Sequence, residues 1–172
     1  GVALVHHLYP LDASLAAAFG AERVAKDVPQ KNAVCVRLLR RSGEPVEVRS
    51  KWEKLQTFKR VCELFADGSL SSRFVFEMLS EAPVAACLDR EGRVALLKRL
   101  VDRHKARTMS EGEAEEVVVM LGAWAEVLDE WVPRPPVKCD RQEDAPRQGL
   151  GLMEVGNWLA LARFVVQGGG GE

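Results

Sequence analysis

The feature that most constrains the fold is a long amphipathic helix predicted at residues 110–131. Ser110 and Glu113 have the spacing of a capping box, in which each residue satisfies an unpaired amide at a helix start. Pro133 prevents the helix from continuing. Between these signals, apolar residues recur at intervals of three and four. They are Ala114, Val117, Val118, Leu121, Trp124, Ala125, Leu128 and Trp131. An apolar face of this width favours a helix packed deep in a bundle.

Length and composition are those of an ordinary globular domain. The 172 residues suffice for a hydrophobic core, and 47% of them are hydrophobic. The formal net charge of −1 provides no overall attraction to nucleic acids or anionic membranes. No apolar run approaches the roughly 20 residues that span a bilayer, and no signal-peptide pattern is present. We therefore expect an intracellular protein, in the cytoplasm or the nucleus, with no membrane partner.

Five further segments have apolar residues at helical spacing. They are residues 11–26, 50–67, 69–80, 89–106 and 152–166. The last segment is almost wholly apolar, which fits a strand as well, but its length favours a helix. Because only a tight connection separates 89–106 from the helix at 110–131, we expect these two to be antiparallel neighbours.

Local signals define the ends of these helices. Asp12 and Asp89 are predicted N-caps, and Ser50 with Glu53 forms a second capping box. Gly68 is expected to end the segment that begins at Ser50. Pro83 is expected to lie beyond the end of the helix at 69–80.

The same periodicity predicts which side chains face the core. The segment at 50–67 has a stripe of large apolar residues that begins at Trp52. In the segment at 89–106, the inward residues are predicted to be Val94, Leu97, Leu100 and Val101.

One segment, residues 33–49, has the alternating pattern of β-strands. Val34, Val36 and Leu38 alternate with more polar positions before the turn residues at 42–45, and Val46 and Val48 alternate after them. We expect a hairpin that packs against helices, because an isolated hairpin is only marginally stable.

These elements predict a mainly α fold, an irregular bundle of about five to six helices with one β-hairpin near 33–49. The expected organisation is a helical domain at 1–132, a loop rich in proline, glycine and charge at 133–151, and an apolar helix at 152–167. That helix would pack on the same domain or on a partner. A glycine linker follows at 168–172, which suggests a domain cut from a larger protein.

Charge is strongly segregated along the chain. Residues 37–60 hold eight basic and three acidic residues, a net charge of +5, and residues 90–107 also have a net charge of +5. Residues 111–130 hold seven acidic residues and no basic one. The simplest interpretation is that the basic helix at 90–107 pairs with the acidic helix that follows. The alternative is an exposed patch that binds phosphates or an acidic partner. Its candidate residues are Arg37, Arg40, Arg41, Lys51, Lys54 and Lys59.

Arg99 and His104 match the R-x4-H pattern of a superfamily of helical-bundle RNases. The resemblance implies an arginine and a histidine that act on a phosphodiester at a dimer interface. Leu100 stands where those enzymes commonly have a polar residue.

No cofactor or metal site is predicted. The adjacent His6 and His7 have no third ligand at suitable spacing, and the four cysteines have neither zinc-binding nor redox spacing. Pro133, Pro136 and Lys138 form a P-x-x-P-x-K segment of the kind that SH3 domains bind, besides ending a helix.

From these observations we expect a non-enzymatic helical module for protein–protein interaction or scaffolding, from a larger protein or complex subunit. The partner is expected to be a protein rather than a small-molecule substrate. The alternatives are a nucleic-acid-associated domain that uses residues 37–60 and, more remotely, an RNase that uses Arg99 and His104.

Overall fold

The computed structural model describes residues 1–28, 30–40, 45–129 and 150–168. It confirms a mainly helical protein with a small sheet. The chain separates into two compact units, Gly1–Gln56 and Thr57–Glu172, a division that the predicted ranges did not contain. The predicted loop at 133–151 and linker at 168–172 lie outside the described residues, except that Leu150, Gly151 and Gly168 belong to a helix.

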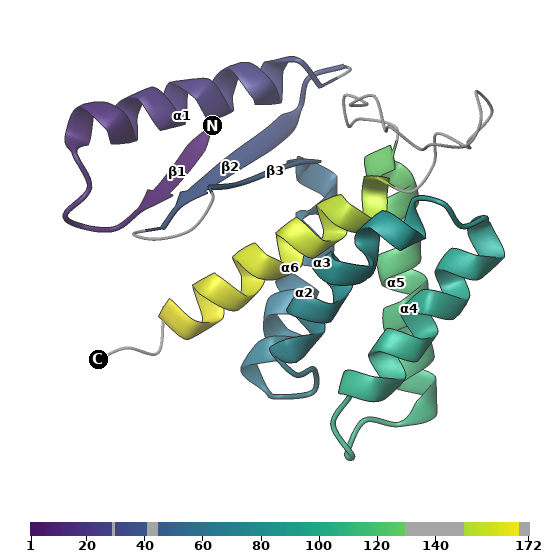
Figure 1. Cartoon of the computed structure of the whole chain (residues 1–172). Helices are drawn as coiled ribbons and strands as arrows, with labels where there is room; N and C mark the ends of the chain where they lie inside the picture. Colours follow the sequence, from purple (N-terminus) through teal and green to yellow (C-terminus); the bar gives the residue numbers. More distant parts are fainter. Residues whose placement is uncertain (29, 41–44, 130–149, 169–172) are drawn as a thin grey trace. The chain divides into compact units, whose positions relative to one another are not determined.

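The first unit is a three-stranded sheet with one helix on it (Figure 1). Strand β1 (Val2–Val5) leads into helix α1 (Leu11–Lys26), which returns the chain to strand β2 (Ala33–Leu39), parallel to β1. Strand β3 (Val46–Lys51) then pairs with β2 in antiparallel register, with Val36 opposite Val48. The hairpin prediction is confirmed. The sequence reasoning missed β1, because four residues are too few to show alternation.

Helix α1 packs closely on the sheet through small residues. Its buried residues are Ala17, Ala21 and Ala25, and the last two contact Cys35 of β2. At Gly20 a Cβ atom would overlap the guanidinium group of Arg37, so the glycine leaves room for that side chain. The prediction of Asp12 as N-cap is wrong. Pro10 occupies this position, and its fixed φ of −56° suits the entry to the helix.

The start of the next helix also differs from the prediction. Ser50 belongs to β3, where it lies opposite Val34 and is completely buried, so the predicted capping box with Glu53 does not form. A short 3-10 helix, η1 (Trp52–Lys54), precedes α2 (Leu55–Ala66), and the Trp52 side chain is exposed rather than buried. Strand pairing up to Lys51 therefore outweighs the local capping signal.

The second unit begins with α2, whose buried residues are Val61 and Leu64. Gly68 adopts a φ of 74°, which confirms it as the stop after this helix. Helix α3 (Arg73–Ala85) begins later than predicted and continues through Pro83. The proline is tolerated because it lies in the last turn, where Ala86 and Cys87 still donate backbone hydrogen bonds to Ala82 and Val84.

Helices α4 (Arg90–His104) and α5 (Glu111–Asp129) match their predicted starts. Asp89 accepts a hydrogen bond from the Gly92 amide at 2.7 Å, and Glu113 accepts one from the Ser110 amide at 2.8 Å. Within α4, however, Val94 is exposed. Leu96 is buried beside the three residues that were predicted correctly, Leu97, Leu100 and Val101. In α5 every predicted core residue up to Leu128 is buried, whereas Trp131 lies outside the described residues.

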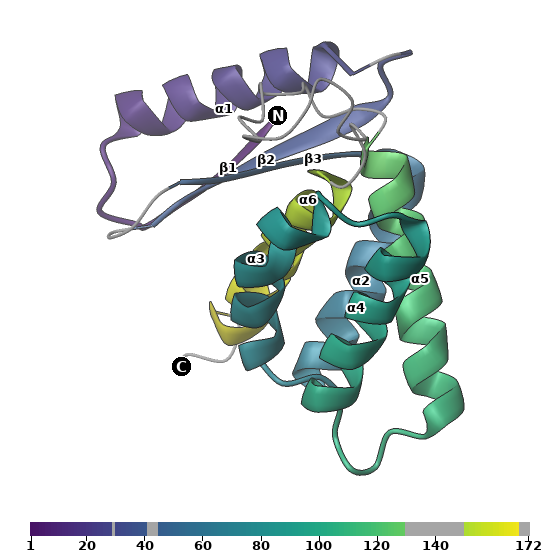
Figure 2. The same cartoon turned by 45° about the vertical axis from the view of Figure 1, so that its right-hand side comes forward.

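Helix α6 (Leu150–Gly168) confirms the predicted C-terminal helix and runs beside α3 (Figure 2). It packs against α3 and α5 of its own chain, while α4 lies beside α5 as expected. Trp158 of α6 contacts Phe58 and Trp124, with ring centroids 5.0 and 5.6 Å away. Near the start of α6, a Cβ atom on Gly151 would overlap the backbone of Ala125, so the two helices approach closely there.

Candidate functional site

The outer face of α1 carries a run of large apolar side chains that remain in solvent. Leu11, Leu15 and Phe19 are spaced four residues apart, so they form one stripe along the helix. Leu8, just before the helix, is likewise a large apolar residue exposed to solvent. The four side chains are 72%, 74%, 49% and 59% exposed for Leu8, Leu11, Leu15 and Phe19. We call these four residues the α1 stripe.

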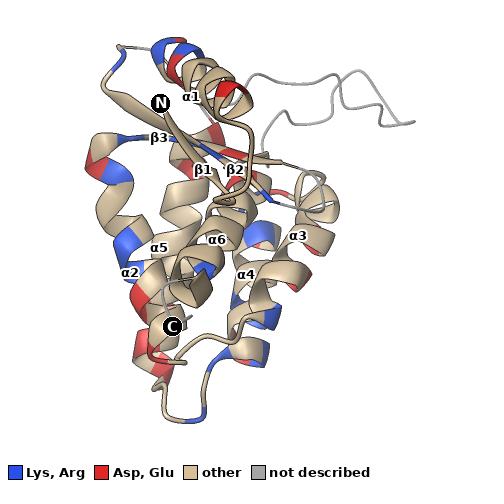
Figure 3. Ribbon diagram, turned by 90° about the vertical axis from the view of Figure 1, so that its left-hand side faces the viewer, with Lys and Arg blue, Asp and Glu red and all other residues tan. Residues whose placement is uncertain are grey.

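The charged residues of α1 lie near the two ends of the helix and not between them. Asp12 stands in the first turn, whereas Glu22, Arg23 and Lys26 stand near the end of the helix, with charge-free helix in between (Figure 3). Glu22 and Lys26 form an ion pair at 2.6 Å, which lowers the pKa of the Glu22 carboxyl. In the described part of the chain, no ion pair uses Asp12 or Arg23.

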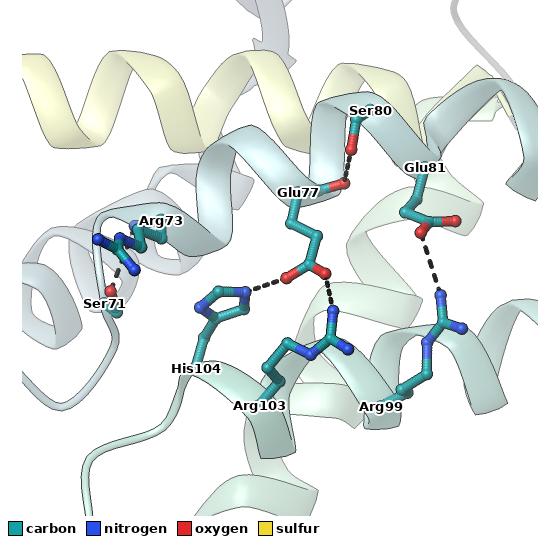
Figure 4. Close-up of polar contacts among 8 residues, drawn as sticks. All are labelled: Ser71, Arg73, Glu77, Ser80, Glu81, Arg99, Arg103 and His104. Carbon is teal, nitrogen blue, oxygen red and sulfur yellow. Dashed lines mark hydrogen bonds and ion pairs between the residues drawn. The ribbon is translucent and has the colours of Figure 1, made fainter.

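A second candidate is a polar cluster between α3 and α4 (Figure 4). Glu77 of α3 points between two side chains of α4, so that one carboxylate oxygen contacts the His104 ring and the other the Arg103 guanidinium. One turn further along α3, Glu81 pairs with Arg99 at 3.2 Å. The His104 ring also contacts Phe74 edge-on, with centroids 6.0 Å apart.

This cluster bears directly on the R-x4-H resemblance. Arg99 and His104 both lie on α4, but each is held by a different carboxylate of α3. The hydrogen bond from His104 is the main cause that lowers the pKa of Glu77, and Arg103 adds to it. A phosphodiester at this site would have to displace two carboxylates. The arrangement is therefore that of a polar contact between two helices.

The predicted basic patch is divided in the structure. Arg37 is half-buried and pairs with Glu47 at 2.5 Å, and buried Lys51 donates a hydrogen bond to the Lys31 carbonyl at 2.5 Å. Lys59 belongs to the second unit and lies 3.9 Å from Glu63. Arg40 is exposed and Lys54 is partly exposed. Arg41 lies outside the described residues, as do Pro133, Pro136 and Lys138 of the polyproline segment.

The basic helix α4 divides its charges between two neighbours. Towards α5, Arg90 pairs with Glu126 at 2.6 Å and Lys105 with Glu111 at 2.7 Å. Towards α3, it uses Arg99 and Arg103. The predicted pairing of α4 with the acidic helix thus exists at its two ends.

Chemistry at cysteine and histidine is limited in the described residues. Burial raises the pKa of the Cys35 thiol to about 11. The rings of His6 and His7 stack with centroids 4.2 Å apart, and no described group of three or more potential ligands could hold a metal ion. Among the helices that the structure describes, none combines the length and the apolar character that crossing a bilayer requires.

Comparison with protein-family models and with curated proteins finds no match for this chain. A function can therefore be inferred only from the structure itself. Sequence reasoning did not identify the α1 stripe as a site, although the signal was present. In α1, alanines and large apolar residues occupy different faces.

Proposed function

We propose that this chain is a non-enzymatic protein–protein interaction module of a larger intracellular protein or complex subunit, and that the α1 stripe is its contact surface. The observation that carries the proposal is the exposure of three large apolar side chains along one helix face, with Leu8 exposed just before the helix. Apolar side chains scattered singly on a surface are ordinary, whereas a contiguous patch marks an interaction site.

The physical argument rests on the cost of leaving this stripe in water. Burial of a leucine or phenylalanine side chain contributes about 1.5–3 kcal/mol relative to exposure. Within the fold, α1 instead buries Ala17, Ala21 and Ala25, which contribute much less. A partner that covers the stripe would recover this free energy, as amphipathic helices do when they bind a groove or another helix.

The test is affinity capture with matched variants. Leu15→Glu places a charge in the middle of the α1 stripe, and Val119→Glu places one on α5, where Val119 is 65% exposed. Both variants should fold, since both sites face solvent. Proteins that are captured by the wild-type chain and by Val119→Glu, but not by Leu15→Glu, are the expected result. Identical capture by all three chains would contradict the proposal.

A further inference from the structure

We infer that the α1 stripe pairs with the α1 stripe of a second copy of this chain, with the two helices antiparallel. The inference rests on the proposed function and names the partner. It depends on two features of α1, the spacing of its exposed apolar residues and the position of its charges.

The exposed residues have the spacing of a helix–helix seam. Within the helix, Leu11, Leu15 and Phe19 follow one another at steps of four residues, and Leu8 lies in the turn just before the helix. Steps of four residues keep these side chains close to one line of the helix, so that they can face a partner helix. Ala16 is also exposed next to this line. A small residue there leaves room for the Phe19 ring of a second copy.

The charges make the stripe complementary to itself. Asp12 and Arg23 are 11 residues apart, which is almost three full turns, so they lie on the same flank of the helix. A two-fold axis near the middle of α1 relates two antiparallel copies and brings Asp12 of each beside Arg23 of the other. An isologous interface requires such a match between a surface and itself. Neither charge forms an ion pair within the described chain.

The parallel alternative lacks this match. A two-fold axis parallel to the helices would put the Asp12 and Arg23 side chains of the two copies on opposite flanks, where they form no pairs across the interface, and it would align the two helix macrodipoles unfavourably. The antiparallel arrangement forms both ion pairs and opposes the macrodipoles.

The size of the stripe predicts a weak dimer. The axis that pairs Asp12 with Arg23 brings Leu11, Leu15 and Phe19 of each copy onto the other helix. Three exposed apolar side chains at on the order of 100 Å² each supply less than half of the 800 Å² per partner that is typical of stable interfaces. We therefore expect a dissociation constant in the micromolar range, on the order of 10–100 µM.

The experiment is sedimentation equilibrium of the 172-residue chain between about 5 and 300 µM, with circular dichroism and thermal melting as controls for folding. The wild-type chain and Val119→Glu should form dimers, and Leu15→Glu should remain monomeric. Asp12→Arg opposes Arg23 of the second copy with a like charge at two places. It should weaken association by roughly 5- to 20-fold.

Charge exchange then tests the orientation. The double variant Asp12→Arg with Arg23→Asp restores both opposite pairs and should recover dimerisation of the wild-type strength. In a parallel dimer neither residue faces its counterpart, so Asp12→Arg alone should leave association nearly unchanged and there is no loss to rescue. An Asp12→Arg variant that associates as strongly as the wild-type chain, or a double variant that does not recover the loss, would overturn the antiparallel pairing.

Failure of this inference can be separated from failure of the proposed function. A wild-type chain that is monomeric at 300 µM overturns self-pairing. If Leu15→Glu still loses captured proteins, the stripe then binds a different partner, and the proposed function stands. A dimer that persists in Leu15→Glu overturns the inference as well, because another surface must hold it.

Discussion

Helices α1 and α6 are both rich in apolar residues, but most of the large apolar side chains of α6 point into the core, whereas most of those of α1 point into solvent. Helix α6 buries ten residues, among them Trp158, Leu159 and Leu152, whereas α1 buries three alanines and leaves Leu11, Leu15 and Phe19 exposed. The close approach of α1 to the sheet explains the difference. Small residues on the inner face permit a short distance between the helix and the sheet, so the large residues must point away from the sheet. The apolar content of a helix therefore does not tell how much it contributes to the core.

The largest difference between the two helices is expected on truncation of an aromatic side chain. Trp158→Ala removes a side chain that is 1% exposed and contacts two other aromatic rings, which should lower the free energy of unfolding by about 3–5 kcal/mol. Phe19→Ala should change it by less than about 0.5 kcal/mol, because Phe19 is 59% exposed. Urea denaturation at low micromolar protein concentration measures both. Equal losses in free energy of unfolding would mean that Phe19 supports the fold as much as Trp158 does, which would contradict the difference between α1 and α6.

The packing of α1 on the sheet, which buries Cys35, predicts a second effect, on the reactivity of that thiol. Burial raises the pKa of the Cys35 thiol to about 11, and the nearby Glu47 carboxylate adds to this shift, whereas Cys87 is exposed. At pH 8 the thiolate fraction of Cys35 is therefore low, and reagents reach it poorly. We expect Cys35 to react with iodoacetamide at least roughly 100-fold more slowly than Cys87.

Site-resolved mass spectrometry during alkylation follows both thiols in one sample. In denaturant the two cysteines should react at similar rates, which controls for differences in detection. Fast alkylation of Cys35 in the native chain would show that α1 opens readily from the sheet.

Two helical glycines, Gly151 in α6 and Gly122 in α5, can be replaced by alanine to test how closely α6 packs. At Gly151 an added Cβ overlaps the backbone of Ala125, so Gly151→Ala should destabilise the second unit by about 1–3 kcal/mol. At Gly122 the nearest atom to an added Cβ is 3.8 Å away, in the Leu97 side chain. Gly122→Ala should therefore stabilise α5 by about 0.5–1 kcal/mol through helix propensity. Thermal melting of the two variants should shift in opposite directions, and a Gly151→Ala variant that melts at or above the wild-type temperature would contradict the close approach.

Much of the helical fold could be predicted because its signals are local. In α5, the capping box and the apolar periodicity agree with each other and with the final packing, so the helix start and the core residues were correct. At Ser50 the local and non-local signals disagree. The capping pattern is present, but Ala33 pairs with Lys51 across the hairpin and holds the segment as a strand. A strand partner 18 positions away in the chain cannot be recognised from the sequence immediately around Ser50.

The candidate surface was harder to predict than the fold. Periodicity identifies the apolar face of a helix, but not whether the sheet or the solvent receives that face. For α1 the deciding factor is side-chain volume, because Ala21 and Ala25 can lie against Cys35 at a distance that Leu15 and Phe19 could not. Strand β1, which α1 also covers, was itself missed. Without it, the close packing under α1 could not be foreseen.

The smallest effect is expected at the polar seam between α3 and α4, where the Arg99 and Arg103 side chains that pair with Glu81 and Glu77 are largely exposed. Hydrogen bonding by His104, and secondarily Arg103, lowers the pKa of Glu77 below its usual range. The folded state therefore holds the Glu77 proton less tightly than the unfolded chain, in which a glutamate titrates near about 4.3. Its contribution to stability is complete above that pH and is lost as the pH falls through the lower, folded-state value.

Glu77→Gln should consequently lower the melting temperature slightly at pH 7, and the difference from the wild-type chain should shrink as the pH falls below about 4. Glu115→Gln is the matched control, since Glu115 is exposed on α5 and forms no ion pair in the described chain. The difference in melting temperature between Glu115→Gln and the wild-type chain should stay constant over the same pH range. A pH-independent loss in Glu77→Gln would mean that this seam depends on the packing of His104 against Phe74, and not on the charge of Glu77. The seam would then hold α4 by apolar contact, as α6 is held, and the polar residues between α3 and α4 would add only specificity of register.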